Sequence, residues 1–370
     1  MKDTSKLKIA LVCDWLTGIG GAERVVLEIH KLFPEAPIYT SQYDPDTLEQ
    51  FADADVRTGR LQKLPKSLKK FLPVLRAWYF SHLDLTDYDL VISISGAEAK
   101  SVKTSSQATH ISYIHSPTHY YWIRYDEYLE HPGFPRGFNW LARLGLKLLI
   151  RPMQLWDFHA AQQPDYLIAN STHTKMMIEK YYKRTSTVIF PPVEVERFKL
   201  TGPEKQRHGF VTAGRQTPYK RIDLAVAACS ELNVPLVVIG NGPEHKKLEK
   251  LAGRSVIFLT NVNDMEMAEH FQTATGFIFP TNVEDFGVTA VEAMAAGTPV
   301  IAYQEGGPKD YIIPNKTGLF FDKLTVKNLV KTLEGFKPEK YDAGAIAHEA
   351  QRFSVQTFTS AMRNFIKASL

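Results

Sequence analysis

The sequence predicts an α/β protein built from two doubly wound parallel sheets, each in a domain of its own. Short β-branched runs bounded by Gly, Pro or Asn alternate with helix-length segments along the whole chain. The chain has 370 residues, which is long for one ordinary domain and comfortable for two. Alternating strands and helices favour parallel sheets covered by helices on both faces.

The strand-like runs fall into two series. In the first half they are residues 8–13, 36–40, 89–95, 110–114, 166–170 and 187–191. In the second half they are residues 208–214, 235–240, 255–260, 275–280, 299–303 and 318–322. A polar, proline-bearing stretch separates the two series and shows no clear period. We therefore expect domains at 1–190 and 208–350, a linker at 191–207, and an amphipathic helix at 351–370.

Composition is that of a soluble globular protein, with 44% hydrophobic and 23% charged residues and a net charge of +4. The two cysteines, Cys13 and Cys229, allow no disulfide framework and no CxxC metal site, which fits a reducing cytoplasm. The apolar run before Asp14 is too short for a signal peptide, and no run is long enough for a spanning helix.

Glycines mark the turn after the first strand, in TGIGGAERVV (17–26). Gly20 and Gly21 permit a close backbone approach to a ligand, and the start of the following helix favours a phosphate. The alternative is a tight strand-to-helix turn. A nicotinamide-binding fingerprint fails, because Glu23 occupies the position of its third glycine.

Two cations flank the first turn of the second half, in GRQTPYKRIDLAV (214–226). Arg215 and Lys220 could grip a nucleoside diphosphate through a guanidinium fork and an ammonium group. The alternative is a pair of solvated surface cations. The next turn contains Gly240, which by itself indicates no more than a turn.

Carboxylates surround the start of an apolar helix in VEDFGVTAVEAMAAG (283–297). Glu292 falls inside a helix that is otherwise apolar, where an uncompensated charge is costly. Its expected partners are ribose hydroxyls; a structural ion pair is the alternative. Glu284 could bind a sugar, and the N–H groups of Phe286, Gly287 and Val288 could bind a phosphate.

His115 follows the strand at 110–114, within YIHSPTHYYW (113–122). A lone histidine is usually structural. If each domain binds its ligand at the carboxyl ends of its strands, His115 and Glu284 would meet only across a cleft between the two domains.

Together these stretches resemble retaining glycosyltransferases of family 4. The shared residues are GGAE (20–23), HSP (115–117), GR..PYKR (214–221), GNGP (240–243), EAMAAGTPVIA (292–302) and GG (306–307), in that order. Within that family the sequence most resembles bacterial mannosyltransferases that build O-antigen and other surface polysaccharides from GDP-mannose. The resemblance spans nearly the whole chain and implies a GT-B fold, in which two Rossmann-like domains face each other across a cleft.

The resemblance also implies roles for the candidate residues. Arg215 and Lys220 would hold the donor diphosphate, which Gly20 and Gly21 approach from the first domain. Glu292 would bind the ribose. Glu284 and His115 would contact the donor sugar near the reacting carbon. Asp285 departs from the serine of many relatives and receives no role. The terminal helix would cross back to the first domain, and no metal or other cofactor would be needed.

Two stretches rich in Lys, Arg, Trp, Phe and Leu, residues 60–80 and 133–152, have the profile of interfacial helices. They indicate a membrane surface and a lipid-linked saccharide acceptor, hence a cytoplasmic protein peripheral on the inner face of the cell membrane. Ordinary amphipathic helices with solvated faces are the alternative. Nucleic acid is disfavoured, since the basic stretches are confined and the net charge is small.

Two other functions remain open. One is a nucleotide-sugar 2-epimerase of GT-B fold, which would form product without an acceptor. The other is a non-catalytic nucleotide-binding subunit, which would be free to lose Glu284, Lys220 or Arg215; the chain has all three.

Overall fold

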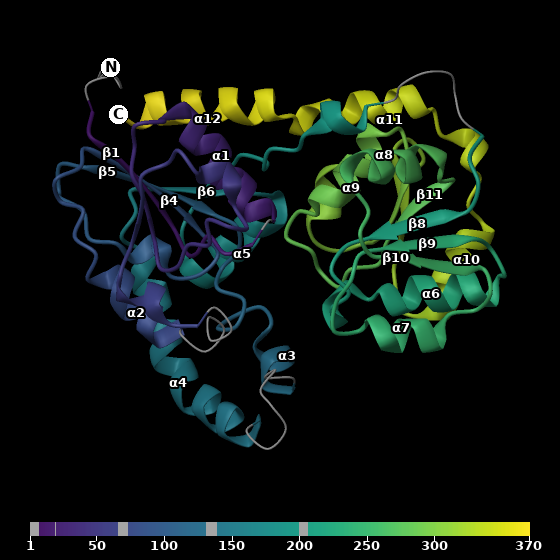
Figure 1. Cartoon of the computed structure of the whole chain (residues 1–370), viewed down its shortest axis with the longest axis horizontal. Helices are drawn as coiled ribbons and strands as arrows, with labels where there is room; N and C mark the ends of the chain where they lie inside the picture. The colour runs from purple at the N-terminus through teal and green to yellow at the C-terminus, as the bar shows by residue number, and fades with distance from the viewer. Residues whose placement is uncertain (1–6, 19, 66–72, 131–138, 200–205) are drawn as a thin grey trace. The chain divides into compact units, whose positions relative to one another are not determined.

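The chain divides into two compact units, which are described separately. A computed structural model describes residues 7–18, 20–65, 73–130, 139–199 and 206–370 (Figure 1). The first unit comprises residues 1–190 and 359–370, and the second comprises residues 191–358. Parts of three sequence expectations lie outside the described residues: 66–72 and 133–138 of the two basic stretches, 200–205 of the linker, and Ile19 of the first glycine turn.

The first unit contains a seven-stranded parallel sheet. Its strand order is β3-β2-β1-β4-β5-β6-β7, so the connections reverse direction between β1 and β4. The strands are β1 (Ile9–Cys13), β2 (Ile38–Thr40), β3 (Val56–Thr58), β4 (Leu90–Ser95), β5 (Thr109–Ile114), β6 (Tyr166–Ala169) and β7 (Thr187–Val188). The α-helices are α1 (Gly21–Leu32), α2 (Pro73–Ser81), α3 (Tyr125–Glu130), α4 (Asn139–Ala160) and α5 (Thr172–Tyr182).

Helices pack on both faces of this sheet. One face presents Ala10, Val12 and Val91 to Phe80 of α2, and farther along it presents Ile114 and Ala169 to α5. On the other face, α1 contacts β1 and β4. Helix α12 (Val355–Ser369) begins in the second unit and gives its last residues to the first, where Phe365 packs edge-on against Tyr166.

The second unit repeats this topology in a six-stranded parallel sheet. Its strand order is β10-β9-β8-β11-β12-β13. The strands are β8 (Phe210–Ala213), β9 (Leu236–Ile239), β10 (Val256–Leu259), β11 (Gly276–Phe279), β12 (Val300–Tyr303) and β13 (Gly318–Phe321). The helices are α6 (Ile222–Glu231), α7 (His245–Leu251), α8 (Asp264–Thr273), α9 (Val288–Ala295), α10 (Val326–Glu334) and α11 (Ala343–Ala350). Helices α6, α7 and α10 cover one face, and α8, α9 and α11 cover the other (Figure 1).

The two sheets confirm the predicted α/β class and each of the twelve expected strands, with boundaries shifted by one to three residues. The sequence prediction missed β3, a short, largely exposed edge strand that lacks an apolar run. It also treated residues 191–207 as a linker. Residues 191–199 instead pack into the second unit, because Val193, Val195 and Phe198 are buried and Phe198 lies against Phe271.

Candidate functional site

The carboxyl edge of the second sheet gathers most of the candidate residues. Strands β8 and β11 are neighbours, and their connections run in opposite directions. Open α/β sheets bind ligands at such a reversal, beyond the carboxyl ends of the strands. The loop after β8 carries Arg215 and Lys220, and the segment after β11 carries Glu284 and leads into α9. Residues far apart in the chain therefore meet at one edge.

Lys220 and Glu284 form an ion pair at this edge. The Lys220 Nζ donates to Glu284 Oε2 at 2.6 Å, and the side chains are 17% and 18% exposed. The ammonium group also lies 5.3 Å from the ring centre of Tyr219 and 5.4 Å from that of Phe279. The sequence analysis assigned these two side chains to different parts of one donor, and the structure places them in direct contact.

Two glycines hold the backbone of Glu284 in place. The Gly307 N–H donates to the Glu284 carbonyl at 2.7 Å. Gly306 has φ +83°, and a Cβ there would lie 2.3 Å from the same carbonyl oxygen. Next to Glu284, Val283 adopts φ +50°, which is rare for a β-branched residue and is typically kept where the surrounding structure enforces it. The backbone conformation of the Glu284 segment therefore depends on glycine at positions 306 and 307.

Helix α9 begins beside this pair. Gly287 precedes it with φ +95° and offers no side chain to cap the first N–H groups. A Cβ on Gly287 would lie 2.8 Å from the Tyr311 hydroxyl and 2.9 Å from the Phe279 ring, so no other residue fits. Phe286 is buried against the Tyr311 ring. The positive end of α9 thus lies one turn from Glu284.

Tyr311 is a member of this site that the sequence analysis missed. Its side chain is fully buried, and its hydroxyl has no hydrogen-bond partner among the described residues. Burial raises the pKa of Tyr311 well above its ordinary value, and the negative charges of Glu284 and Asp310 add to the effect. The hydroxyl therefore stays protonated as a potential donor beside the start of α9. Its only sequence signal is its place shortly after the two glycines at 306–307.

Glu292 lies inside α9 and is 6% exposed. Its neighbours Val291, Ala293 and Met294 are fully buried, so the carboxylate is carried by an apolar helix as the sequence analysis expects. Val288 begins that helix one turn earlier. The role of Glu292 toward a ribose stays a prediction.

The loop after β8 presents Arg215 on the surface. Its side chain is exposed, and among the described residues it forms no ion pair. The loop itself is held in place, because the buried Gln216 amide N–H donates to the Gly240 carbonyl at 2.8 Å and the Gln216 Oε1 accepts from the His245 Nδ1 at 2.7 Å. A Cβ on Gly240 would lie 2.3 Å from the Gly214 carbonyl oxygen. Close packing against the Gly214 backbone therefore explains the glycine at position 240, which the sequence alone did not explain.

The remaining candidates lie in the first unit. Gly20 precedes α1 and Gly21 begins it. His115 follows β5; its N–H donates to the Ser95 carbonyl at 2.9 Å, and its own carbonyl accepts from Thr174 Oγ1 at 3.2 Å. Its ring packs edge-on against Tyr113. The backbone of His115 is therefore fixed at the carboxyl edge of its own sheet.

The same edge of the first unit contains buried charges that the sequence analysis did not assign. Asp14 accepts N–H groups from Gly96, Ala97 and Ala99 at 2.7–3.0 Å, which ties the loop after β4 to the end of β1. Asp157 of α4 is fully buried and pairs with Lys100 at 2.7 Å.

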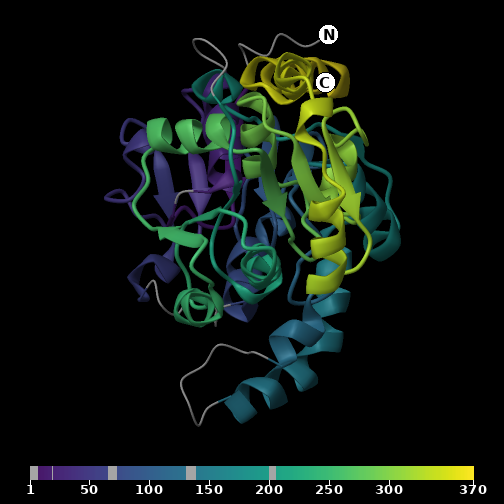
Figure 2. The same ribbon diagram turned by 90° about the vertical axis from the view of Figure 1, so that its right-hand side faces the viewer.

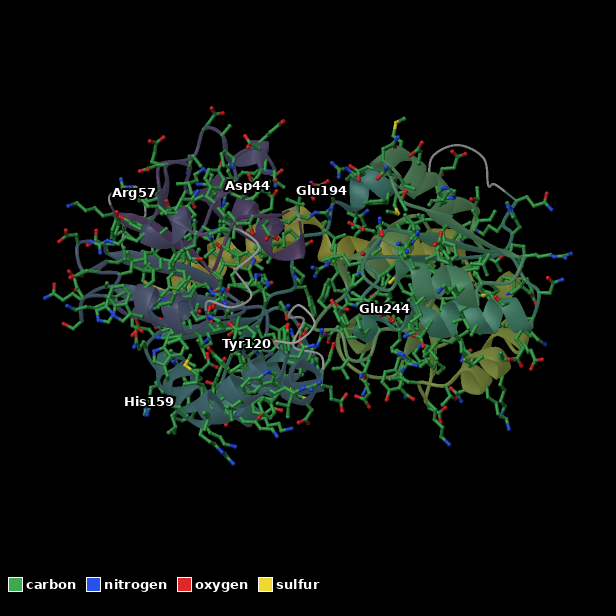
Figure 3. The ribbon with its side chains drawn as sticks, turned by 60° about the horizontal axis from the view of Figure 1, so that its bottom comes forward. Asp44, Arg57, Tyr120, His159, Glu194 and Glu244 are labelled. Carbon is green, nitrogen blue, oxygen red and sulfur yellow. The ribbon has the colours of Figure 1, made fainter. Side chains whose placement is uncertain are left out.

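A second buried pair links α2 to the same edge. Arg76 donates to Glu98 at 2.8 Å, and the hydroxyl of Tyr120, labelled in Figure 3, donates to the same carboxylate. Both side chains of the ion pair are nearly inaccessible to solvent. These groups hold the first unit together rather than face a ligand.

A cavity in the second unit lies away from this site. This cavity of about 500 Å³ is lined by residues at the amino edge of the sheet, including Arg207, Thr275 and Pro299. That edge is opposite to the candidate site.

In the part of the chain that the structure describes, no three His, Cys, Asp or Glu side chains are grouped to hold a metal ion. The metal requirement stays a prediction.

Comparison with known proteins agrees with the geometry of the second unit. Residues 193–351 match the family model described as glycosyl transferases group 1. We call residues 193–351 the group 1 module, because over these residues the chain is similar to that family. The match contains Arg215, Lys220, Gly240, Glu284 and Glu292, and it ends before α12.

Relatives and solved structures extend the comparison beyond the group 1 module. The chain is 27% identical over 243 residues to a GDP-mannose-dependent alpha-mannosyltransferase of Mycobacterium tuberculosis, covering 62% of this chain and 59% of the relative. It is 25% identical over 379 residues to the alpha-1,3/1,6-mannosyltransferase ALG2 of Candida glabrata, covering 85% and 79%. The chain spans 50–59% of the length of three of the curated relatives that it matches.

The fold comparison covers both units. A sucrose-phosphate synthase from Thermosynechococcus elongatus superposes with a TM-score of 0.71 at 18% identity, over 97% of this chain and 98% of that one. At this identity the likeness shows the fold. Together with the two Rossmann-like parallel sheets, it confirms the predicted GT-B fold.

Proposed function

We propose that the chain is a retaining glycosyltransferase that moves a hexosyl group, mannose from GDP-mannose, to a lipid-linked saccharide in surface glycan synthesis. The observation that carries the proposal is the Lys220–Glu284 pair beside the start of α9, inside the group 1 module. A cation, a carboxylate and a helix start in one place match the opposite charges that develop when a glycosyl diphosphate bond breaks.

The donor diphosphate would bind the cationic part of the site. Breaking the bond between the sugar and the diphosphate leaves negative charge on the diphosphate. Lys220, exposed Arg215 and the N–H groups of Phe286, Gly287 and Val288 supply positive charge and donors for it. Because Lys220 and the start of α9 already lie at one edge of the sheet, only side-chain shifts would be needed to stabilise the leaving group. No metal is needed if these groups suffice.

The carboxylates would serve the sugar and the ribose. The Glu284 side chain is 18% exposed, and a diphosphate that draws Lys220 toward itself would leave Glu284 facing the sugar. There it would stabilise the positive charge of the oxocarbenium-like centre. Glu292 would accept both ribose hydroxyls. From the first unit, His115 would hydrogen-bond the donor sugar, and Gly20 and Gly21 would approach the diphosphate.

The choice of donor and acceptor rests on names of relatives. One relative is named a GDP-mannose-dependent alpha-mannosyltransferase, and the Xenopus laevis relative is named for transfer from GDP-mannose to a dolichyl-diphosphate-linked saccharide. These names favour GDP-mannose and a lipid-linked acceptor for this chain. With such an acceptor the protein would act at the cytoplasmic face of a membrane.

A thermal-shift panel with GDP, UDP, ADP, GDP-mannose and UDP-sugars tests the donor. We expect GDP and GDP-mannose to raise the unfolding temperature, and stabilisation by a UDP compound but not by GDP would overturn the mannose assignment. Incubation with GDP-mannose and a polyprenyl-diphosphate-linked saccharide then tests transfer, and the anomeric configuration of the product tests retention. Product formed without acceptor would indicate an epimerase, and nucleotide binding without any product a non-catalytic subunit.

A further inference from the structure

Helix α4 exposes an apolar stripe that no described element covers. Trp140, Leu144, Leu148 and Leu155 are 61%, 48%, 68% and 62% exposed. Their spacing of four, four and seven residues places them on one face of the helix. Met153, Asp157 and Ala160, on the opposite face, are buried in the first unit. An amphipathic helix normally turns its apolar face inward, so α4 is inverted along this stripe.

The helix is firmly rooted at its carboxyl half. The Asp157 carboxylate accepts hydrogen bonds from Lys100, Thr118, Trp122 and Tyr182 at 2.7–2.8 Å. The amino half extends away from the body of the first unit in both views (Figures 1 and 2). The hydrogen bonds of Asp157 therefore fix the orientation of the helix with the stripe facing outward.

Helix α2 packs beside α4 and exposes large apolar side chains of its own. Ala77 of α2 and Met153 of α4 belong to one buried cluster, and the Trp156 ring N–H donates to Ser81 Oγ at 3.2 Å. On its outer side α2 exposes further large apolar side chains, Val74, Leu75 and Trp78. We call the exposed apolar residues of α2 and α4 the apolar face.

Cations border the apolar face. Lys147 and Arg151 are exposed, and neither has an acidic partner among the described residues. Arg143 donates to the carbonyls of Leu129 and Glu130 at the end of α3, so α3 lies on the Arg143 side and leaves the stripe uncovered. Between residues 139 and 156 the chain contains no acid. Exposed apolar side chains bordered by unpaired cations are typical of a helix in the interface of an anionic bilayer.

We propose that the apolar face docks on an anionic lipid bilayer, with the indole and leucine side chains among the lipids and Lys147 and Arg151 against the headgroups. This inference rests on the proposed function, because a membrane surface gives access to a lipid-linked acceptor. It adds to that function the residues that contact the membrane. A symmetric pair of chains would bring the unpaired cations of two copies near each other, which favours a lipid partner over a second copy. Among the described residues no helix has the length and apolarity to cross a bilayer.

Vesicle flotation of the full chain, without nucleotide or acceptor, tests the docking surface. We expect the chain to float with vesicles of phosphatidylglycerol and phosphatidylcholine, and to float less with phosphatidylcholine alone or at high salt. The double variant Leu144→Glu/Leu148→Glu removes apolar contact on exposed positions, so it should fold normally and lower the bound-to-free ratio at least about tenfold. Lys147→Gln/Arg151→Gln should lower binding to the anionic vesicles and abolish most of the salt dependence.

The matched control changes exposed apolar residues elsewhere. Ile257 and Met265 of the second unit are 58% and 82% exposed, and Ile257→Glu/Met265→Glu should float like the parent chain. Failure of the parent chain to float at low salt, or equal flotation of both double variants, overturns the inference. So does light scattering that shows a dimer dissolved by Leu144→Glu/Leu148→Glu without vesicle binding. If the chain transfers mannose but does not float, the docking surface is wrong and the proposed function stands. If it floats but neither binds nor transfers a sugar nucleotide, the proposed function is wrong and the docking surface stands.

Discussion

The two units share one topology but fill the reversal point of their sheets differently. In the first unit, the Asp14 carboxylate accepts three N–H groups of the loop after β4. In the second unit, the neighbouring strand ends carry Arg215, Lys220 and Glu284. The first unit thus satisfies its loop N–H groups with a carboxylate of its own, and the second keeps cations at the same place.

Solvent exposure of the ion pairs shows the same difference. In the first unit the Lys100–Asp157 side chains are 1% and 0% exposed. In the second, the Lys220–Glu284 side chains are 17% and 18% exposed. A fully buried pair cannot exchange partners without leaving an uncompensated charge, whereas a pair that solvent and ligands can partly reach can do so. The comparison teaches that a fully buried pair links elements of its own unit, whereas a partly exposed pair at a sheet edge can be reached by a ligand.

The largest effect should come from breaking a buried pair. Asp157→Ala leaves the Lys100 charge and three other donors without their acceptor, so we expect the first unit to lose about 3–5 kcal/mol of unfolding free energy. Denaturant unfolding followed by fluorescence measures it. Asp84→Ala is the control, because Asp84 and Lys103 lie 3.7 Å apart at the exposed surface and the change should cost much less than Asp157→Ala. Equal losses for the two variants would remove the distinction between buried and exposed pairs.

Breaking the partly exposed Lys220–Glu284 pair should affect turnover more than stability. Lys220→Ala or Arg215→Ala should lower the transfer rate at least about a hundredfold, which corresponds to about 2.7 kcal/mol of transition-state stabilisation. The unfolding free energy should change less than in Asp157→Ala, because the Lys220–Glu284 pair is more exposed than the Lys100–Asp157 pair. Lys250→Ala, at an exposed position of α7, is the control and should retain full activity. A Lys220 variant within threefold of the parent rate would exclude this lysine from the mechanism.

The glycine behind Glu284 should have an intermediate effect. Gly306→Ala places a Cβ 2.3 Å from the Glu284 carbonyl oxygen at φ +83°, which should cost about 1–3 kcal/mol of stability and displace the Glu284 segment. Thermal unfolding and donor binding measure the two consequences. Gly335→Ala adds a Cβ no closer than 3.5 Å at φ −84°, so it should be neutral or slightly stabilising. A Gly306 variant as stable as the Gly335 variant would contradict the dependence on glycine at position 306.

The smallest effect concerns acid stability of the first unit. His110 is fully buried, its ring lies 2.9 Å from Ser93 Oγ, and burial together with the charge of Arg184 lowers its pKa from 6.5 to about 3. The folded state therefore excludes a proton that the unfolded state binds below its pKa of 6.5. The stabilisation is complete above pH 6.5 and is lost as the pH falls toward 3, by about 1 kcal/mol between pH 6 and pH 5.

His110→Gln tests this dependence because the amide cannot take up a proton in this range. The unfolding free energy of the first unit in the variant should fall less steeply between pH 6 and pH 5 than in the parent chain. Parallel slopes for the two chains would show that another group controls acid stability.

Local patterns allowed the sequence by itself to determine the α/β class, the strand series and the turn glycines. Short apolar runs separated by helix-length segments leave few topologies, and Gly287 and Gly306 are recognisable because a left-handed backbone favours glycine. The burial of Glu292 also followed from its own helix, since Thr289 is the one other polar residue in it.

Only the tertiary structure decided which charges meet. Lys220 and Glu284 are 64 residues apart, and Lys100 and Asp157 are 57 apart, so no local period predicts either pair. The tertiary structure likewise turned the leucines of α4 outward and buried Asp157 instead. The physical reason is that burial and pairing depend on which elements pack together at the edge of a sheet, and that packing is a property of the whole fold.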